Sequence, residues 1–235
     1  MSRLNILSGG AAQGLVGSLA PAFKAQTGFD IAGEFGAVGL MADKLRGGTP
    51  ADIVILTAAL VAKLAEEKLV IAAAISDVGL VETALAVRTG DPEAAVRDPA
   101  DLREALLASD AIFVPDTKAS TAGIHVANVL QQLGIADEVA ARLRIFPNGA
   151  TAMRELAASE ARRPIGCTQS TEIISTKGVT LSGSLPPGCE LATMYTAGIT
   201  IAAAHPQQAQ DLIDLLTGAA QHELRKRAGF ISSRG

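Results

Sequence analysis

One local pattern constrains this chain more than any other feature. A short run typical of a β-strand ends in a turn of small and hydroxyl residues, and a helix pattern follows at once. The turns lie at residues 8–14, 36–39, 118–123, 147–151 and 168–171. A helix start carries unpaired backbone N–H groups and the positive end of the helix dipole, and small residues let an anion approach both. The pattern therefore predicts a protein that holds an anion.

The alternation of strand and helix patterns predicts an α/β fold of βαβ units on parallel sheets. Strands are expected at Leu4–Leu7, Ile31–Phe35, Ile53–Leu56, Ala111–Val114, Leu143–Phe146 and Ile165–Cys167. Two successive α/β sets predict two lobes, residues 1–82 with 196–235 and residues 83–195, with the ligand cleft between them. An extended run at Val78–Val87 is the expected hinge, and Leu191–Ala204 reads as a long return strand.

Composition excludes several classes of partner. The chain has 235 residues, of which 49% are hydrophobic, so it can bury a substantial core. Aromatic residues make up only 3%, and the net charge is -4, which argues against a nucleic-acid partner. The apolar runs are far shorter than the roughly 18 residues of a membrane span. The expected partner is therefore a small anionic ligand.

The N-terminus and the cysteines bear on the compartment. Met1-Ser2-Arg3 leads directly into the first strand with no apolar leader, so the chain as written is expected in the cytoplasm. A periplasmic protein whose leader had been removed would read the same. Cys167 and Cys189 are read as buried or incidental thiols, and no His or Cys spacing matches a metal site. Neither a metal nor a cofactor is expected.

Five short segments give the chain a family resemblance. They are Ala20–Lys24 with Thr27-Gly28, Gly47–Ile53, Thr121–Ile124, Pro164–Gly166 and Ser175–Val179. In order and spacing they resemble the periplasmic molybdate-binding proteins of the type II periplasmic solute-binding superfamily. The resemblance implies a two-lobed α/β fold with a ligand cleft between the lobes. It also implies an ABC transporter permease as partner if the protein is exported.

The resemblance also implies which positions hold the ligand. They are Gly9, Gly10 and Ala11 in the first turn, Val38 and Gly39 in the second, Ala122 in the third, Asn148 and Gly149 in the fourth, and Gln169. Two of these turns carry a hydroxyl in the family, and Gln169 takes the place of a tyrosine. Each missing charge-assisted hydrogen bond costs about 1.5–3 kcal/mol. A small carboxylate is therefore expected in preference to a molybdate-like oxyanion.

Several side chains in the turns can add donors. Ser120, Thr121, Gln169 and Ser170 are neutral donors for which helix capping and ligand contact are compatible roles. Tyr195 is the one tyrosine of the chain, and it reads equally well as a ligand donor and as a packing residue with a satisfied hydroxyl.

An enzyme remains an alternative. Relatives described as isomerases of unsaturated tricarboxylates resemble this chain in lacking the family serines, and that reaction needs a general base. The candidates are His125, Glu172 and Lys118. Each has a plainer interpretation: His125 as a partner of local polar groups, Glu172 as a capping-box residue for Gln169, and Lys118 as a solvated cation. A cytoplasmic anion sensor is a third alternative.

Overall fold

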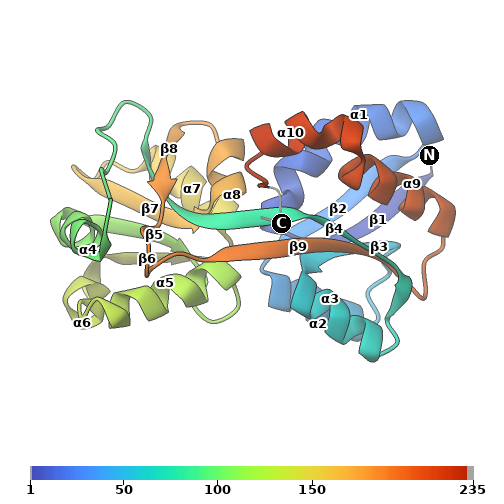
Figure 1. Ribbon diagram of the computed structural model, residues 1–235, viewed down its shortest axis with the longest axis horizontal. Helices are drawn as coiled ribbons and strands as arrows, with labels where there is room; N and C mark the ends of the chain where they lie inside the picture. The colour runs from blue at the N-terminus through green and yellow to red at the C-terminus, as the bar shows by residue number, and fades with distance from the viewer. Residues whose placement is uncertain (1, 232–235) are drawn as a thin grey trace. The chain divides into compact units, whose positions relative to one another are not determined.

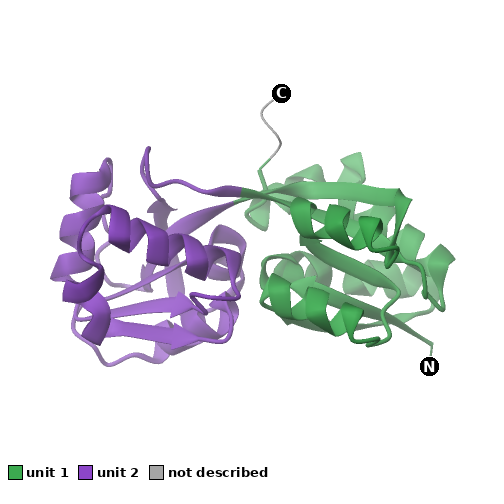
Figure 2. Cartoon of the chain, turned by 90° about the horizontal axis from the view of Figure 1, so that it is seen from below, with its two compact units in different colours: residues 1–81, 193–235 green, residues 82–192 purple. Residues whose placement is uncertain are grey.

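The computed structural model describes residues 2–231 of the chain, which form two compact units (Figure 2). Unit 1 comprises residues 1–81 and 193–235, and unit 2 comprises residues 82–192. Two strands, β4 (Val70–Arg88) and β9 (Ala192–Thr200), run from one unit into the other. The boundaries expected from the sequence, after residues 82 and 195, also fall within these strands.

Unit 1 is a mixed sheet with helices on both faces. Its other elements are β1 (Arg3–Gly9), η1 (Gly10–Ala12), α1 (Gln13–Thr27), β2 (Asp30–Gly36), α2 (Val38–Arg46), β3 (Ile53–Thr57), α3 (Ala58–Glu66), α9 (Pro206–Thr217), η3 (Ala219–Gln221) and α10 (His222–Arg227). The strand order is β2-β1-β3-β9-β4. β1 pairs in parallel with β2 and β3, and β9 runs antiparallel to β3. In Figure 1, α1 and α9 cover one face and α2 and α3 the other.

The core of unit 1 follows from its sequence pattern. In α1 the buried residues are Leu15, Val16, Leu19 and Phe23, which form one stripe along the helix. Gly28 ends this helix in the left-handed conformation, at φ 77°, which glycine adopts without steric cost. The strand β3 is covered on both faces and is apolar at almost every position, as expected for a central parallel strand.

Unit 2 repeats this design with a different chain order. Its other elements are α4 (Pro99–Ala108), β5 (Ala111–Pro115), α5 (Thr121–Gln132), α6 (Ala136–Val139), η2 (Ala140–Arg142), β6 (Leu143–Phe146), α7 (Gly149–Ala158), β7 (Pro164–Gln169), α8 (Ser170–Ser175) and β8 (Val179–Ser184). The strand order is β4-β7-β5-β6, and β8 also pairs with β4. β5 is parallel to β6 and β7, whereas β4 is antiparallel to β7.

The two faces of the sheet in unit 2 carry separate cores. Leu85 and Cys167 are paired residues that belong to the cluster formed with α5, whereas Ala84 and Ala86 pack with Met153 of α7. This division follows from the alternation of side chains along a strand. Cys167 and Cys189 are buried free thiols, and burial raises the pKa of Cys167 to about 12. Neither thiol is therefore set up as a nucleophile.

The structure corrects two expectations about the long strands. β4 begins at Val70, well before the expected start at Val78, because residues 70–77 complete the sheet of unit 1. β9 ends at Thr200, so the run Ile201–Ala204 forms an exposed turn and does not continue the strand. The alanines of that run are apolar but small, so their exposure costs little. Within residues 2–231, no helix is both long enough and apolar enough to cross a bilayer.

Candidate functional site

In each unit, three parallel strands end at one edge of the sheet and each leads into a helix. The last residues of these strands are Gly9, Gly36 and Thr57 in unit 1, and Pro115, Phe146 and Gln169 in unit 2. Parallel pairing brings the carboxyl ends of neighbouring strands to the same edge, so the following helix starts gather there as well. Each unit therefore has one edge where backbone N–H groups and positive helix ends are concentrated.

The helix starts of unit 1 lack side-chain caps. No side chain accepts a hydrogen bond at the start of η1 after Gly9, or at the start of α2 after Ala37. A Cβ atom on Gly9 would lie 2.8 Å from Cγ1 of Val38 and 2.9 Å from Cε1 of Tyr195. Only glycine therefore lets the second turn and the tyrosine ring approach the first turn this closely. The structure thus brings together three residues that the sequence pointed to.

The positions around these three are mostly buried. Gly10 and Ala11 lie in the buried turn η1, while Gly39 in the first turn of α2 is half-buried. Tyr195 is 2% exposed and faces Thr57 across the β3–β9 pair. Tyr195 has an interaction partner within the protein, which agrees with a packing role as well as with one beside a ligand.

In unit 2, the start of α5 is also uncapped. Its N-cap residue is Ser120, whose side chain makes no capping hydrogen bond, and Thr121 and Ala122 form the first turn. The preceding loop is fixed by Asp116, whose Oδ1 accepts hydrogen bonds from the backbone N–H groups of Lys118 and Ala119 at 2.7 and 2.9 Å. The side chain of Asp116 therefore holds this loop, while the start of α5 has no side-chain cap.

At the end of β7 lies a cluster of buried polar atoms without partners. Gln169 is 3% exposed, and neither Nε2 nor Oε1 of its amide has a hydrogen-bond partner in the structure. The hydroxyls of Thr83 and Thr171 are buried and equally unpartnered. Thr83 is paired with Gln169 across β4 and β7, so their side chains share a face of the sheet. That face also carries Leu85 and Cys167, which pack with α5.

Unpartnered polar atoms of this kind are rare in folded proteins, because each costs about 1–3 kcal/mol when buried without a hydrogen bond. Four such atoms on three residues at one edge of unit 2 require a functional explanation. We name this group, Thr83, Gln169 and Thr171, the Gln169 cluster. Its members can offer both donors and acceptors to a bound molecule.

Glu172, three residues after Gln169, is also buried, but its carboxylate has several hydrogen-bond partners. Its carboxylate accepts a hydrogen bond from Oγ1 of Thr168 at 2.6 Å and from the backbone N–H groups of Gly149, Ala150 and Gln169. Burial raises the pKa of Glu172, and these four hydrogen bonds act against that rise. The bond to Gln169 N–H is the capping interaction expected from the sequence, while the bonds to α7 were not foreseen.

This network changes the interpretation of the fourth turn. The N–H groups of Gly149 and Ala150 are bonded to Glu172, and Oδ1 of Asn148 accepts from the N–H of Thr151 at 2.8 Å. The start of α7 is therefore already neutralised by a carboxylate of the protein itself. Asn148 and Gly149, expected from the sequence to contact the ligand, instead have these groups engaged within the protein.

The three candidate bases, His125, Lys118 and Glu172, have different surroundings in the structure. Nε2 of His125 donates to the carbonyl oxygen of Cys189 at 2.8 Å, which matches the plainer interpretation of this residue. The side chain of Lys118 is exposed, and Glu172 lies within the network described above. Ser170, at the start of the short helix α8, is 7% exposed and has a partner within the protein.

Sequence reasoning missed Thr83 and Thr171. Thr171 stands in a turn that the sequence did single out, and Thr83 follows Glu82 as a second polar residue in an otherwise apolar run. A polar residue such as Thr83 within an otherwise apolar strand was the feature of the sequence that could have identified it as a site residue. Its meaning depends on the pairing of β4 with β7, which composition does not reveal.

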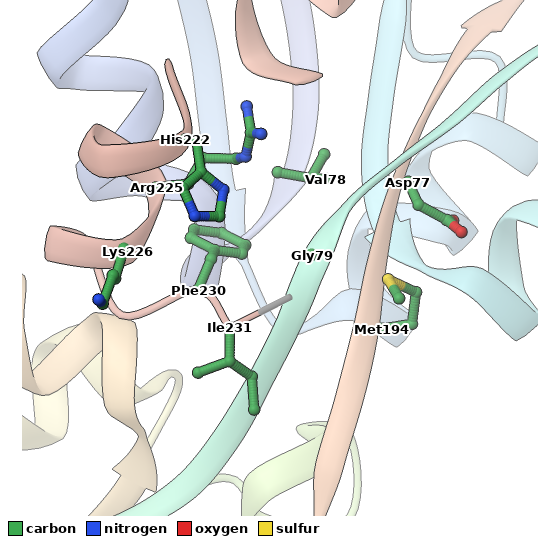
Figure 3. Close-up of a pocket in the computed structure, with 9 residues that line it drawn as sticks. All are labelled: Asp77, Val78, Gly79, Met194, His222, Arg225, Lys226, Phe230 and Ile231. Carbon is green, nitrogen blue, oxygen red and sulfur yellow. The ribbon is translucent and has the colours of Figure 1, made fainter. Parts of the chain in front are cut away.

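A cavity of about 440 Å³ in unit 1 lies away from these residues. Figure 3 shows basic side chains of α10 on one side and β4 and β9, with Asp77 and Met194, on the other. Asp77 already accepts from the hydroxyl of Thr196, and Arg225 donates to the carbonyls of Leu216 and Gly218. The cavity contains no residue expected to bind the ligand, so its size alone does not make it the site.

Nowhere in residues 2–231 do three or more His, Cys, Asp or Glu side chains gather as a metal site would require.

Replacing Gly149 tests the Glu172 network. A Cβ atom at this position would lie 1.9 Å from Oε2 of Glu172 and 2.1 Å from Oγ1 of Thr168, so Gly149→Ala must displace the buried carboxylate. We expect a loss of about 2–4 kcal/mol in the free energy of unfolding, measured by urea denaturation. Gly17→Ala is the control, because nothing lies within 4 Å of its Cβ and alanine favours the helix by about 0.5–1 kcal/mol. Equal stabilities of the two variants would contradict the network.

The pH dependence of stability tests the charge on Glu172. A carboxyl whose pKa is raised in the folded state stabilises the fold most at a pH below its ordinary pKa of 4.5, and loses that contribution as the pH rises through the folded value. The stability of the wild-type protein relative to Glu172→Gln should therefore fall between about pH 4 and neutral pH. Urea denaturation of both proteins across that range measures the difference. A difference that rises with pH would mean that the hydrogen bonds outweigh burial.

Comparison with known proteins agrees with the architecture. A curated relative, "Aconitate isomerase" of a Pseudomonas species, is 24% identical over 227 residues, which is 92% of this chain and 82% of the relative. "Molybdate-binding protein ModA" of Escherichia coli K12 is 24% identical over 217 residues, 90% of this chain and 82% of the relative. The solved structure of the Azotobacter vinelandii periplasmic molybdate-binding protein superposes with a TM-score of 0.80 at 18% identity, covering 98% of this chain and all of the other.

These matches confirm the expected fold class, a two-lobed α/β periplasmic-binding-protein fold, and the resemblance to the molybdate-binding proteins. The family described as bacterial extracellular solute-binding protein matches residues 4–231, nearly the whole chain. This protein therefore belongs to the family of bacterial extracellular solute-binding proteins.

Proposed function

We propose that this solute-binding protein binds a small anion and that the ligand is a carboxylate. The observation that carries the proposal is the Gln169 cluster, four buried polar atoms without partners. Three of them, on Thr83 and Gln169, lie on the face of the sheet that packs with α5, and the fourth is the hydroxyl of Thr171 in α8. An anion at the uncapped start of α5 would accept hydrogen bonds from backbone N–H groups and meet the positive end of the helix. Nε2 of Gln169 and the hydroxyls of Thr83 and Thr171 would supply further donors.

In unit 1, the proposed anion donors lie at the starts of two helical elements. The buried turn at Gly10 and Ala11 and the start of α2 at Val38 and Gly39 have no side-chain caps. No hydroxyl stands at these four positions, so their donors are main-chain N–H groups. Small residues there leave room for a ligand larger than a tetrahedral oxyanion. Ser120 and Thr121 remain proposed side-chain donors in unit 2.

The preference for a carboxylate follows from the donors that are lost. The resemblance to molybdate-binding proteins implies hydroxyls in the first two turns and at position 169, whereas this chain has glycine, alanine, valine and glutamine there. Charge-assisted hydrogen bonds contribute about 1.5–3 kcal/mol each, so this loss weighs against molybdate. A carboxylate group has two oxygens where molybdate has four, so it needs fewer hydrogen-bond donors. The rest of a carboxylate ligand can also contact the walls of the binding site.

Family membership supports a role in transport. Because the family is described as extracellular, we propose that the protein acts outside the cytoplasm and delivers its ligand to an ABC transporter permease. The cytoplasmic location expected from the sequence rested on the first residues alone. An anion sensor inside the cell is the alternative that this proposal replaces.

A thermal-shift screen tests the binding function. A ligand at about 100 times its dissociation constant adds about 2.7 kcal/mol, which corresponds to about 5–10 °C for a protein of this size. We expect small di- and tricarboxylates to give such shifts and molybdate, tungstate and sulfate to give less. Gly39→Val should abolish the shift while the variant still unfolds cooperatively, because the added branches occupy the space beside the helix start. Tight binding of molybdate in calorimetric titration would overturn the argument from side-chain donors.

Isomerisation of an unsaturated tricarboxylate is a second candidate function, favoured by the likeness to a protein named aconitate isomerase. The geometry favours binding instead, since His125 is bonded to Cys189 and Glu172 to two helix starts. We therefore expect no deuterium uptake when the protein is incubated with cis- or trans-aconitate in deuterated water and followed by proton NMR. Uptake that His125→Ala suppresses would establish the enzyme in place of the binding protein.

A further inference from the structure

The amide of Gln169 carries chemical information beyond the presence of a binding site. One end of the amide, Nε2, is a donor of two hydrogen bonds, and the other end, Oε1, is an acceptor. Both ends are buried and unpartnered, so the observation holds whichever way the amide is turned. The residue is 3% exposed, which leaves little bulk water to satisfy either end.

The neighbouring groups do not satisfy the acceptor end. The hydroxyls of Thr83 and Thr171 are the other unpartnered polar groups of the cluster, and neither bonds to Oε1. The backbone N–H of Gln169 is taken by Glu172, which also accepts from Thr168. The backbone N–H of Gln169 and the hydroxyl of Thr168 are therefore committed to Glu172, and no donor of the protein bonds to Oε1 in the structure.

A fully deprotonated anion cannot provide that donor. Sulfate, molybdate and simple carboxylates present only acceptor oxygens at neutral pH, so they could bond to Nε2 but would leave Oε1 buried and unpaired. A ligand that carries a hydroxyl next to its negative charge can engage both ends of the amide at once. A site built to bond a hydroxyl discriminates strongly against the analogue that lacks it.

We propose that Gln169 selects anions that carry their own hydroxyl donor, and that the ligand of this protein is a hydroxycarboxylate. This inference rests on the proposed function, because it requires anion binding at the Gln169 cluster. The anionic group of the ligand lies at the start of α5, and its hydroxyl donates to Oε1 of Gln169. Hydrogen phosphate also carries a hydroxyl beside its negatively charged oxygens, so the test includes both a hydroxycarboxylate and a phosphate.

Matched ligand pairs provide the test. Isothermal titration of the full chain at about pH 7.5 compares malate with succinate, citrate with tricarballylate, and hydrogen phosphate with sulfate. In each pair only the first ligand offers a hydroxyl donor. We expect the hydroxylated member to bind about 5- to 150-fold more tightly, the range expected when a buried acceptor gains or loses its partner. Preference in the carbon pairs assigns the hydroxyl to a carboxylate, and preference in the inorganic pair alone assigns it to phosphate and overturns the hydroxycarboxylate.

Three variants test whether Gln169 causes the preference for the hydroxylated ligand. Gln169→Met keeps the length of the side chain without donor or acceptor, so the ratio within each pair should fall to within about twofold. Gln169→Glu keeps the acceptor and adds a negative charge, so both members should bind more weakly while the hydroxyl preference remains. Gln131→Met, at an exposed position of α5, is the control and should leave the ratio unchanged. Thermal unfolding of each variant checks that it folds.

The outcomes separate this inference from the function on which it rests. If none of these anions nor any in the thermal-shift screen binds the wild-type protein, the proposed function fails and the inference fails with it. If anions bind but the paired ligands have equal affinities, the binding function stands and the inference is overturned. A preference that persists unchanged in Gln169→Met removes Gln169 from the recognition of the hydroxyl.

Discussion

Parallel strand pairing is the constraint on which the rest of this structure depends. β1 pairs in parallel with β2 and β3, and β5 pairs in parallel with β6 and β7. Each parallel strand must be followed by a crossover, and the helices that make those crossovers all begin at the carboxyl edge of the sheet. Within each unit, positive helix ends are therefore collected at one edge before any side chain is specified. The side chains then decide which of those ends are neutralised and which are left for a ligand.

Gln169 and Glu172, three residues apart, show how side chains determine which helix starts are neutralised. Glu172 turns its carboxylate to the starts of α7 and α8 and satisfies three backbone N–H groups, so an internal anion neutralises this corner of unit 2. Gly149 has no side chain at the point where that carboxylate lies, which is why the arrangement is possible. Gln169, at the end of the same strand, keeps both ends of its amide without a partner. The protein thus closes the starts of α7 and α8 with its own charge and leaves the start of α5 uncapped.

Much of the fold was predictable from the sequence, because the apolar periodicity and the turn residues agree. The strands β1, β2, β3, β5 and β6 lie where the patterns indicated, within a few residues, and a helix follows each of the five predicted turns. The first half of β4 was missed because residues 71–77 are mostly exposed or half-buried, and their alanines are poor indicators of a strand. Ile201 was misassigned because an isoleucine before three alanines resembles a buried run, although it is 58% exposed.

The candidate site was less predictable than the fold. The turn residues of unit 1 lie together as their spacing suggested, since short βα turns leave little freedom. The partners of polar side chains depend on contacts between distant segments, and these are invisible in a local pattern. Thr83 acquires its meaning only from its pairing with Gln169, and the engagement of Gly149 only from the reach of Glu172.

The passage of β4 and β9 between the units has a consequence for the order of folding. Unit 2 is one continuous stretch, residues 82–192, whereas unit 1 needs β9 between β3 and β4 to complete its sheet. During synthesis residues 82–191 of unit 2 leave the ribosome before β9 does. Bringing β9 beside β3 also closes a loop of more than a hundred residues, which makes this a slow, non-local step. Unit 1, whose first 81 residues are synthesised before unit 2, must therefore wait for β9 to complete its sheet, and the edge of β3 stays unpaired until β9 arrives.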